Sequence, residues 1–186
     1  MDVIAQLDTI LPELDHVASR VGPDQFGAPT PCANFAVRDL FDHMIGGAGQ
    51  FAPQLRGAAS AAATDPARLD DGERPAALKS ALAELLDAVK APGALGRGVT
   101  LPFGTVPGAV LARFLTVDGM VHTWDMARAT GQRYEPPAEL AETVLATARE
   151  LIASEMRDGD TFAAEVEVAD DAPAIDRLVA FTGRTP

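Results

Sequence analysis

The chain has 186 residues, of which 47% are hydrophobic and 23% charged, so residues 1–186 are expected to form a single globular domain with a sizeable core. Its 15 basic and 27 acidic side chains give a formal charge of −12, and aromatic residues make up only 5%. Because this charge repels phosphate groups, nucleic acids and anionic membrane surfaces are excluded as expected partners.

Three features of the sequence predict a cytoplasmic protein. No apolar run approaches the roughly 20 residues that cross a bilayer. The segment Met1–Asp8 lacks the basic start and the apolar block of a signal peptide. Cys32 is the single cysteine, which excludes an internal disulfide and favours a reducing compartment.

Helical periodicity dominates the first third of the chain. Apolar residues at helical spacing predict a helix over residues 4–21, and the proline-rich residues 28–33 predict an extended connector. A second helix is predicted from residue 37 towards residue 55. Gly46 and Gly47 lie inside it, where each glycine costs about 1 kcal/mol relative to alanine. Their presence indicates either a close approach by another backbone or a ligand, or a break in the helix.

The remaining segments also predict a mainly helical, all-α protein. We expect a low-complexity connection over 57–74, a helix from Pro75 to residue 89 and a small hairpin or irregular loop over 99–106. A long helix is predicted over 108–130, ended by Gly131, and another from the Pro136-Pro137 pair to residue 152. The last predicted elements are a strand-like piece over 165–168 and a terminal helix around 175–181. The simplest such architecture is a four-helix bundle with a fifth helix or a short C-terminal appendage.

Two of the three histidines lie among residues that should face the interior. His16 falls on the polar side of the first predicted helix, whereas His43 and His122 accompany apolar neighbours. Asp118 lies four residues before His122 on the same helical face, and Asp125 continues this line one turn further. Because the helix is otherwise apolar nearly all round, these carboxylates should be buried, and a buried carboxylate requires a partner or a cation.

Two imidazoles and a carboxylate on two facing helices predict a divalent-metal site formed by His43, Asp118 and His122. Imidazole suits zinc, nickel and iron, and a site with three protein ligands keeps positions open for a substrate. Asp125 would then either fix an imidazole tautomer or contact the ligand directly. The alternative is a hydrogen-bond network in the core that needs no metal. Cys32 is interpreted as an inert packed thiol.

Several segments resemble the DinB-like metal-binding family and, more narrowly, the relatives of the N-terminal domain of mycothiol-dependent maleylpyruvate isomerase. They are Ala28–Phe35 with Val37–Gly47, Asp118–Gly131 and Ala172–Arg184. This resemblance implies an up-down-down-up four-helix bundle with a metal, zinc before nickel or iron, held near one end by His43, Asp118 and His122. It also implies a low-molecular-weight thiol cosubstrate such as mycothiol. Many relatives carry glutamate at the position of Asp118, and the shorter side chain is expected to affect metal choice or affinity.

The resemblance implies thiol chemistry, because a metal-coordinated thiol loses its proton and becomes a nucleophile. Residues 158–186 are expected to be too few for the second domain of the isomerase, so S-transfer to a small electrophile is the leading hypothesis and isomerisation a weaker one. A non-catalytic bundle that binds a metal or a small molecule is the alternative. A non-haem iron oxygenase would use the same ligand types, but the all-helical setting argues against it. A homodimer is left open.

Overall fold

The structure is a computed structural model that describes residues 1–58, 65–101, 104–157, 159 and 162–186. These residues form mostly helices, with one two-stranded hairpin. The helices are α1 (Val3–Ala18), α2 (Val37–Leu55), α3 (Arg74–Lys90), α4 (Gly108–Thr130), α5 (Ala138–Leu151) and α6 (Ala174–Phe181), and the strands are β1 (Gly98–Leu101) and β2 (Gly104–Pro107). Single turns of 3-10 helix are η1 (Pro66–Arg68), η2 (Ala94–Gly96) and η3 (Ser154–Met156). The predicted mainly helical class is confirmed, and no helix of the described part is long and apolar enough to cross a bilayer.

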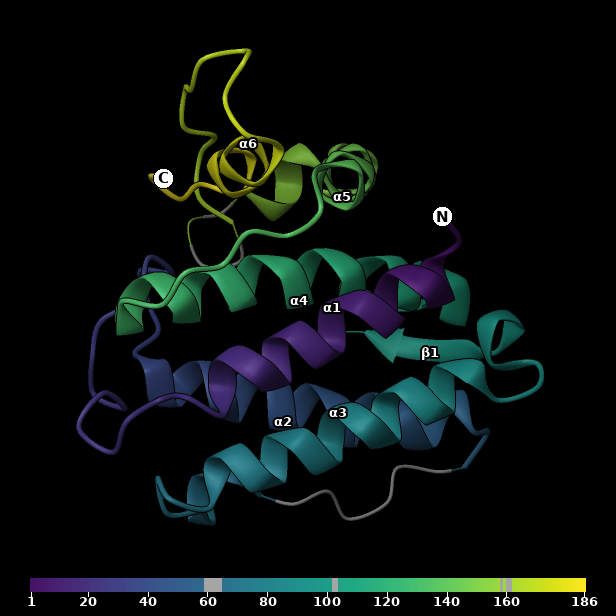
Figure 1. The fold of residues 1–186 in the computed structure, drawn as a ribbon. Helices are drawn as coiled ribbons and strands as arrows, with labels where there is room; N and C mark the ends of the chain where they lie inside the picture. The colour runs from purple at the N-terminus through teal and green to yellow at the C-terminus, as the bar shows by residue number, and fades with distance from the viewer. Residues whose placement is uncertain (59–64, 102–103, 158, 160–161) are drawn as a thin grey trace.

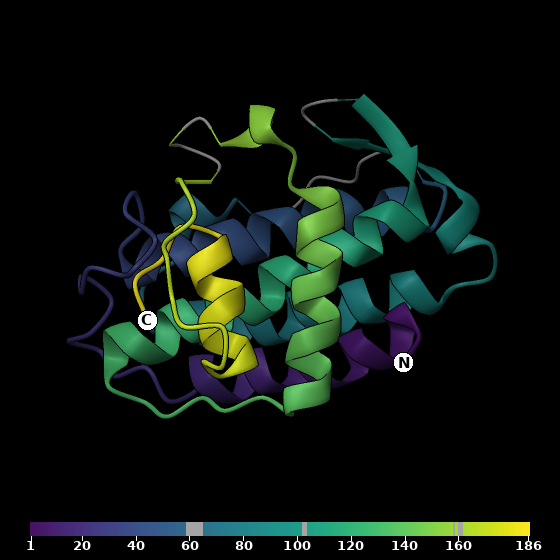
Figure 2. The same cartoon turned by 90° about the horizontal axis from the view of Figure 1, so that it is seen from above.

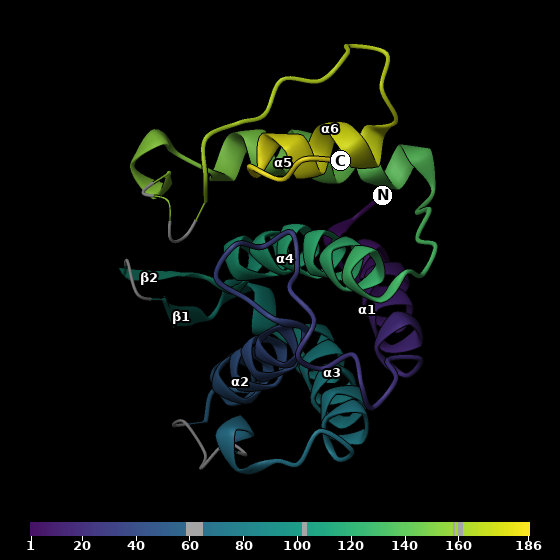
Figure 3. The ribbon, with the colours of Figure 1, turned by 90° about the vertical axis from the view of Figure 1, so that its left-hand side faces the viewer.

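The helices lie in three layers (Figure 1). Helices α2 and α3 pack together, α1 and α4 form the next layer, and α5 and α6 cover the far side of α4 (Figure 3). Seen from above, α5 and α6 lie side by side and cross α4 steeply (Figure 2). One apolar core lies among α1, α2, α3 and α4, and a second lies between α4 and the α5/α6 pair. Helix α4 is apolar nearly all round because it packs against both cores.

Local interactions explain where the helices begin and end. The Asp2 carboxylate accepts a hydrogen bond from the Ala5 N–H at 3.0 Å and caps α1. Ala36 has no capping side chain, and the Asp39 carboxylate instead accepts from the Ala36 N–H at 2.8 Å. Gly131 ends α4 as predicted, with a positive φ of 69°. Helix α2 runs without a break through Gly46 and Gly47.

Two predictions about strands had different outcomes. The hairpin is confirmed: β1 and β2 pair antiparallel from Gly98 opposite Pro107 to Leu101 opposite Gly104, and its turn at 102–103 lies outside the described residues. The prediction of a strand-like piece over residues 165–168 is wrong, because these residues form no strand. The Val166 N–H donates to the Ala180 carbonyl at 3.0 Å, and no neighbouring strand in the described ranges offers this segment a ladder.

Part of the low-complexity connection over 57–74 is held by one buried arginine, while residues 59–64 lie outside the described residues. Arg74 is 4% exposed and donates to both carboxylate oxygens of Asp42 on α2, at 2.9 and 3.1 Å. It also donates to Asp71 and to the Leu69 carbonyl. Because one guanidinium satisfies all these acceptors, η1 and the turn before α3 are tied to α2.

Gly108 begins α4 at a point without room for a side chain. A Cβ atom there would lie 2.2 Å from the Ala94 carbonyl oxygen and 3.0 Å from Leu55 Cδ2. The Gly108 N–H also donates to the Arg97 carbonyl at 2.7 Å, which limits any shift of the helix start. We therefore expect Gly108→Ala to lower the free energy of unfolding by about 1–3 kcal/mol, measured by urea denaturation.

The matched control for this substitution is Gly96→Ala. A Cβ atom on Gly96 would meet nothing within 4 Å, so this variant should unfold within about 0.5 kcal/mol of the wild type. Equal stability of the two variants would contradict the close approach at Gly108.

Candidate metal centre

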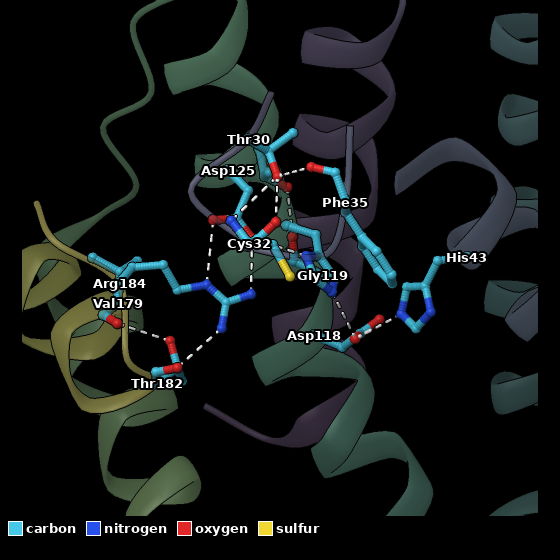
Figure 4. Close-up of polar contacts among 12 residues, drawn as sticks. Thr30, Cys32, Phe35, His43, Asp118, Gly119, Asp125, Val179, Thr182 and Arg184 are labelled. Carbon is cyan, nitrogen blue, oxygen red and sulfur yellow. Dashed lines mark hydrogen bonds and ion pairs between the residues drawn. The ribbon is translucent and has the colours of Figure 1, made fainter. Parts of the chain in front are cut away.

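The three predicted ligands lie together between α2 and α4 (Figure 4). His43 Nε2 on α2 lies 3.1 Å from Asp118 Oδ1 on α4, and His122 Nε2 lies 3.4 Å from the same oxygen. One ligand atom from each residue lies within 4.8 Å of the other two. The residues predicted from helical spacing therefore meet at one point.

The donor set and its spacing fit a divalent metal. Bonds of about 2.0–2.1 Å in a tetrahedral site separate neighbouring donors by about 3.3 Å. The two contacts with Asp118 Oδ1, at 3.1 and 3.4 Å, lie close to that spacing. Two imidazole nitrogens and a carboxylate oxygen are donors that zinc, nickel and iron accept. His43, Asp118 and His122 could thus hold such an ion with little rearrangement.

The site is open on the side of His43. The His43 side chain is 40% exposed and that of Asp118 is 33% exposed, whereas that of His122 is 9% exposed. The expectations that His43 faces the interior and that Asp118 is buried are therefore both wrong in part. The His43 ring points to Asp118 but borders a cavity that solvent can reach. This opening would let a small molecule approach the ligand atoms.

A buried ion pair between Asp125 and Arg184 (Figure 4) contacts His122 through Asp125. Asp125 is fully buried, and its Oδ2 lies 2.9 Å from His122 Nδ1. Arg184 Nη2 donates to the same oxygen at 3.0 Å, and Arg184 Nε donates to Oδ1 at 3.3 Å. Because Nδ1 is engaged by Asp125, the other ring nitrogen of His122 is left to face His43 and Asp118. Of the two predicted roles for Asp125, this geometry favours fixing the imidazole.

Charged neighbours shift the pKa values of His122 and Asp118. Burial by itself would lower the pKa of His122, but the carboxylates of Asp118 and Asp125 raise this pKa to about 9. Burial would likewise raise the pKa of Asp118, yet His43 and His122 hold it well below its usual range. In the protein without a metal, Asp118 is thus ionised and His122 carries a proton at neutral pH. A bound metal would displace that proton.

Arg184 was missed by sequence reasoning as a functional residue. It follows Gly183, whose φ of 92° and close approach to Ala163 turn the chain back towards α4. A side chain at position 183 would place its Cβ 2.6 Å from the Ala163 Cβ. The sequence did indicate that a buried Asp125 would need a cation nearby. It did not indicate which one, because Arg184 lies 59 residues further along the chain.

A cavity of about 340 Å³ extends from the three ligands into the apolar core. Apolar side chains from α1, α2, α3 and α4 make up most of its wall. Residues after α5 complete the wall, and they include Met156, Phe162 and Arg184. The Phe35 ring, in the loop before α2, lies 5.6 Å from the His43 ring and 6.1 Å from the His122 ring. The sequence did not predict these wall residues, because they come from distant segments.

Cys32 lines the same cavity as a half-buried thiol. Burial is the largest influence and raises its pKa above the ordinary value of 9.0, the charge of Arg184 lowers it in part, and Asp125 and Asp118 raise it further. At neutral pH the thiol is therefore protonated and weakly nucleophilic, in agreement with an inert cysteine.

Alkylation should show this property of Cys32. At pH 8 we expect iodoacetamide to modify Cys32 at least about fivefold more slowly in the folded protein than in urea, because the folded thiol holds less thiolate. The ratio should fall as the pH rises above the folded pKa. Mass spectrometry measures both rates, and faster modification of the folded protein would identify a reactive cysteine instead.

A family model described as the mycothiol maleylpyruvate isomerase N-terminal domain matches residues 7–127. His43, Asp118, His122 and Asp125 lie inside this range, and Arg184 lies outside it. Two uncharacterized proteins of Mycobacterium tuberculosis, MT0763 (strain CDC 1551 / Oshkosh) and Rv0738 (strain H37Rv), are each 38% identical over 168 residues, which cover 90% of this chain and 89% of theirs.

The fold is similar to the crystal structure of a mycothiol-dependent maleylpyruvate isomerase, with a TM-score of 0.63 and 14% identity. A histidine-to-alanine mutant of that isomerase matches with the same TM-score and 15% identity. Both matches cover 77% of this chain and 66% of the isomerase, so this chain spans just under two thirds of that protein's length. The family match and the two relatives together show that the chain belongs to the family of the mycothiol maleylpyruvate isomerase N-terminal domain.

Proposed function

We propose that this protein is a metal-dependent S-transferase that joins a low-molecular-weight thiol, of the mycothiol type, through its sulfur to a small electrophile. His43, Asp118 and His122 would hold the divalent metal, with zinc preferred over nickel or iron. The observation that carries this proposal is the convergence of three donor atoms within 4.8 Å at the wall of an accessible cavity. When bound, the metal would supply the charge that deprotonates a coordinated thiol at neutral pH.

The chain's own residues would position the reactants. Asp125 fixes the ring of His122 through Nδ1, and Arg184 offsets the charge of Asp125. The half-exposed side of the site near His43 gives the thiol access, and the cavity wall receives the electrophile. The apolar side chains of that wall offer no hydrogen bonds to water, which favours reaction of the thiol over hydrolysis of the electrophile.

The proposed reaction needs no oxidant or reductant. The thiol S–H adds across an activated carbon–carbon double bond, so that a C–S bond forms, the π bond breaks, and the proton ends on the neighbouring carbon. Isomerisation begins with the same addition. It then requires rotation about the carbon–carbon bond that the addition has made single, followed by release of the thiol to restore the double bond. We assign the shared addition step to this protein.

We also propose the architecture that would accompany this function. Residues 1–186 form a single domain, and α1, α2, α3 and α4 follow the up-down-down-up order of a DinB-like bundle. Pairing of α2 with α3 and of α1 with α4 supports this order. The appendage formed by α5 and α6 would stabilise the site through Arg184.

Turnover assays with and without a chelator test the proposal. Protein loaded with zinc should accelerate the reaction of mycothiol with a maleimide above the uncatalysed rate, chelation should abolish the acceleration, and added zinc should restore it. Metal binding without any acceleration would instead support the non-catalytic bundle. If the protein neither binds zinc nor accelerates the reaction, the metal site itself is rejected.

A further inference from the structure

The wall of the cavity bears on which electrophiles the site accepts, a question that rests on the proposed function. Most of its lining is apolar, from Met44 and Phe51 on α2, Leu82 and Leu85 on α3, Leu115 on α4 and Phe162 after η3. Leu82, Leu85 and Leu115 are each at most 7% exposed, so the cavity reaches into the core of the bundle. Its volume of about 340 Å³ is that of a pocket for one small molecule.

The polar groups of the wall leave no spare positive charge for an acidic ligand. Among the described lining residues, Arg184 is the one arginine or lysine. Its guanidinium forms an ion pair with the fully buried Asp125 and donates through Nη1 to the Thr182 carbonyl at 3.0 Å. Because Asp125 offsets this charge, Arg184 is a weak partner for a second carboxylate.

The remaining charges of the site also disfavour an acidic ligand. Asp118 is negative and lies directly on the cavity wall. The two positive charges of a divalent ion held by the site would be balanced by Asp118 and by the deprotonated sulfur of the cosubstrate. The whole chain carries a formal charge of −12, which further disfavours the entry of anions.

We infer that the electrophile taken by this site is an uncharged, largely apolar small molecule of one or two rings, and not a dicarboxylate. Burying a carboxylate against leucine and phenylalanine side chains costs free energy that the described wall does not offset, because Arg184 and a protonated His122 are already paired with Asp125 and Asp118. A neutral ring loses only apolar contact with water and gains contact with the wall. Gly47 is part of this specificity, because its missing side chain leaves space in the wall beside Phe51.

A matched pair of maleimides tests the inference in turnover. N-phenylmaleimide and its para-carboxyphenyl analogue share the same reacting double bond, and the carboxylate lies far from it. The Cys32→Ala variant serves as the background, so that the protein's own thiol does not react. With zinc and mycothiol, and after division by each uncatalysed rate, we expect the neutral compound to react at least about tenfold faster. Equal rates, or a faster reaction of the carboxylate, would overturn the inference.

Binding to the metal-free protein gives a readout that does not depend on turnover. The unreactive N-phenylsuccinimide and its para-carboxy analogue can be followed through the methionine methyl signals in NMR spectra. Met44 and Met156 line the cavity, whereas Met120 and Met126 are buried elsewhere and serve as internal references. We expect the neutral compound to shift the signals of Met44 and Met156 at concentrations at least about tenfold lower than its analogue. Shifts confined to the reference methionines, or tighter binding of the carboxylate, would overturn the inference.

The neighbouring glycines of α2 provide a matched pair of variants. Gly47→Leu places a side chain in the cavity and should weaken binding of the neutral compound at least about tenfold. Gly46→Leu adds the same side chain at a position outside the described wall, with Pro66 Cγ 3.9 Å from its Cβ, and should bind as the wild type does. If neither maleimide is accelerated, the proposed function fails, while the succinimide titration still decides the preference of the cavity.

Discussion

Zinc is expected to bind the His122→Ala variant at least about 100-fold more weakly than the wild-type protein, since loss of an outer partner alone costs about 10–100-fold. His122 supplies one of three donor atoms, and its Nε2 lies 3.4 Å from Asp118 Oδ1. Its removal leaves His43 and Asp118, which are too few to fill a tetrahedral site without additional water. Isothermal titration of the metal-free proteins with zinc at one pH measures the difference.

Two further variants separate a metal ligand from a general loss of structure. His16 is an exposed histidine on α1 away from the site, so His16→Ala should bind zinc as the wild type does. Asp125→Asn keeps a side chain beside His122 Nδ1 but removes the charge, and should weaken binding by about 10–100-fold. Equal zinc affinities of His122→Ala and His16→Ala would refute the assignment of the ligands.

Much of the site was predictable because it depends on local geometry. Asp118, His122 and Asp125 are spaced by four and three residues on one helix, so helical periodicity alone places them along one line. The hydrophobic pattern of α2 then places His43 on the inward-facing side of that helix. The exposures of His43 and of Asp118 differed from the prediction, because the depth of a side chain depends on the loop and the appendage that cover the bundle.

Contacts between distant segments could not be predicted in the same way. Arg184 reaches Asp125 only because α6 crosses α4 and Gly183 turns the chain inward. Met156 and Phe162 reach the cavity wall from the segment after α5. Hydrophobic periodicity predicts which residues are buried but not which core they enter, and residues of α4 contribute to both cores. The alternation at 165–168 likewise predicted a strand although the fold provides no partner strand there.

The pair formed by Asp125 and Arg184 should contribute strongly to stability. Arg184→Met is expected to lower the free energy of unfolding by about 3 kcal/mol, because it leaves the carboxylate of Asp125 buried without its guanidinium partner. Hydrogen bonding from His122 limits the loss to the lower end of the range for such pairs. Urea denaturation in the presence of a chelator measures this effect without any contribution from a bound metal.

A double variant distinguishes the buried charge from lost packing. Asp125→Asn combined with Arg184→Met removes both charges, so it should be more stable than Arg184→Met alone, whereas two independent losses would add. Arg133 forms an ion pair with Glu135 in which the side chains are 82% and 65% exposed, so Arg133→Met should leave stability unchanged. If Arg184→Met behaved like Arg133→Met, the appendage would not depend on this ion pair, and the support of His122 by Asp125 would have to come from α4 alone.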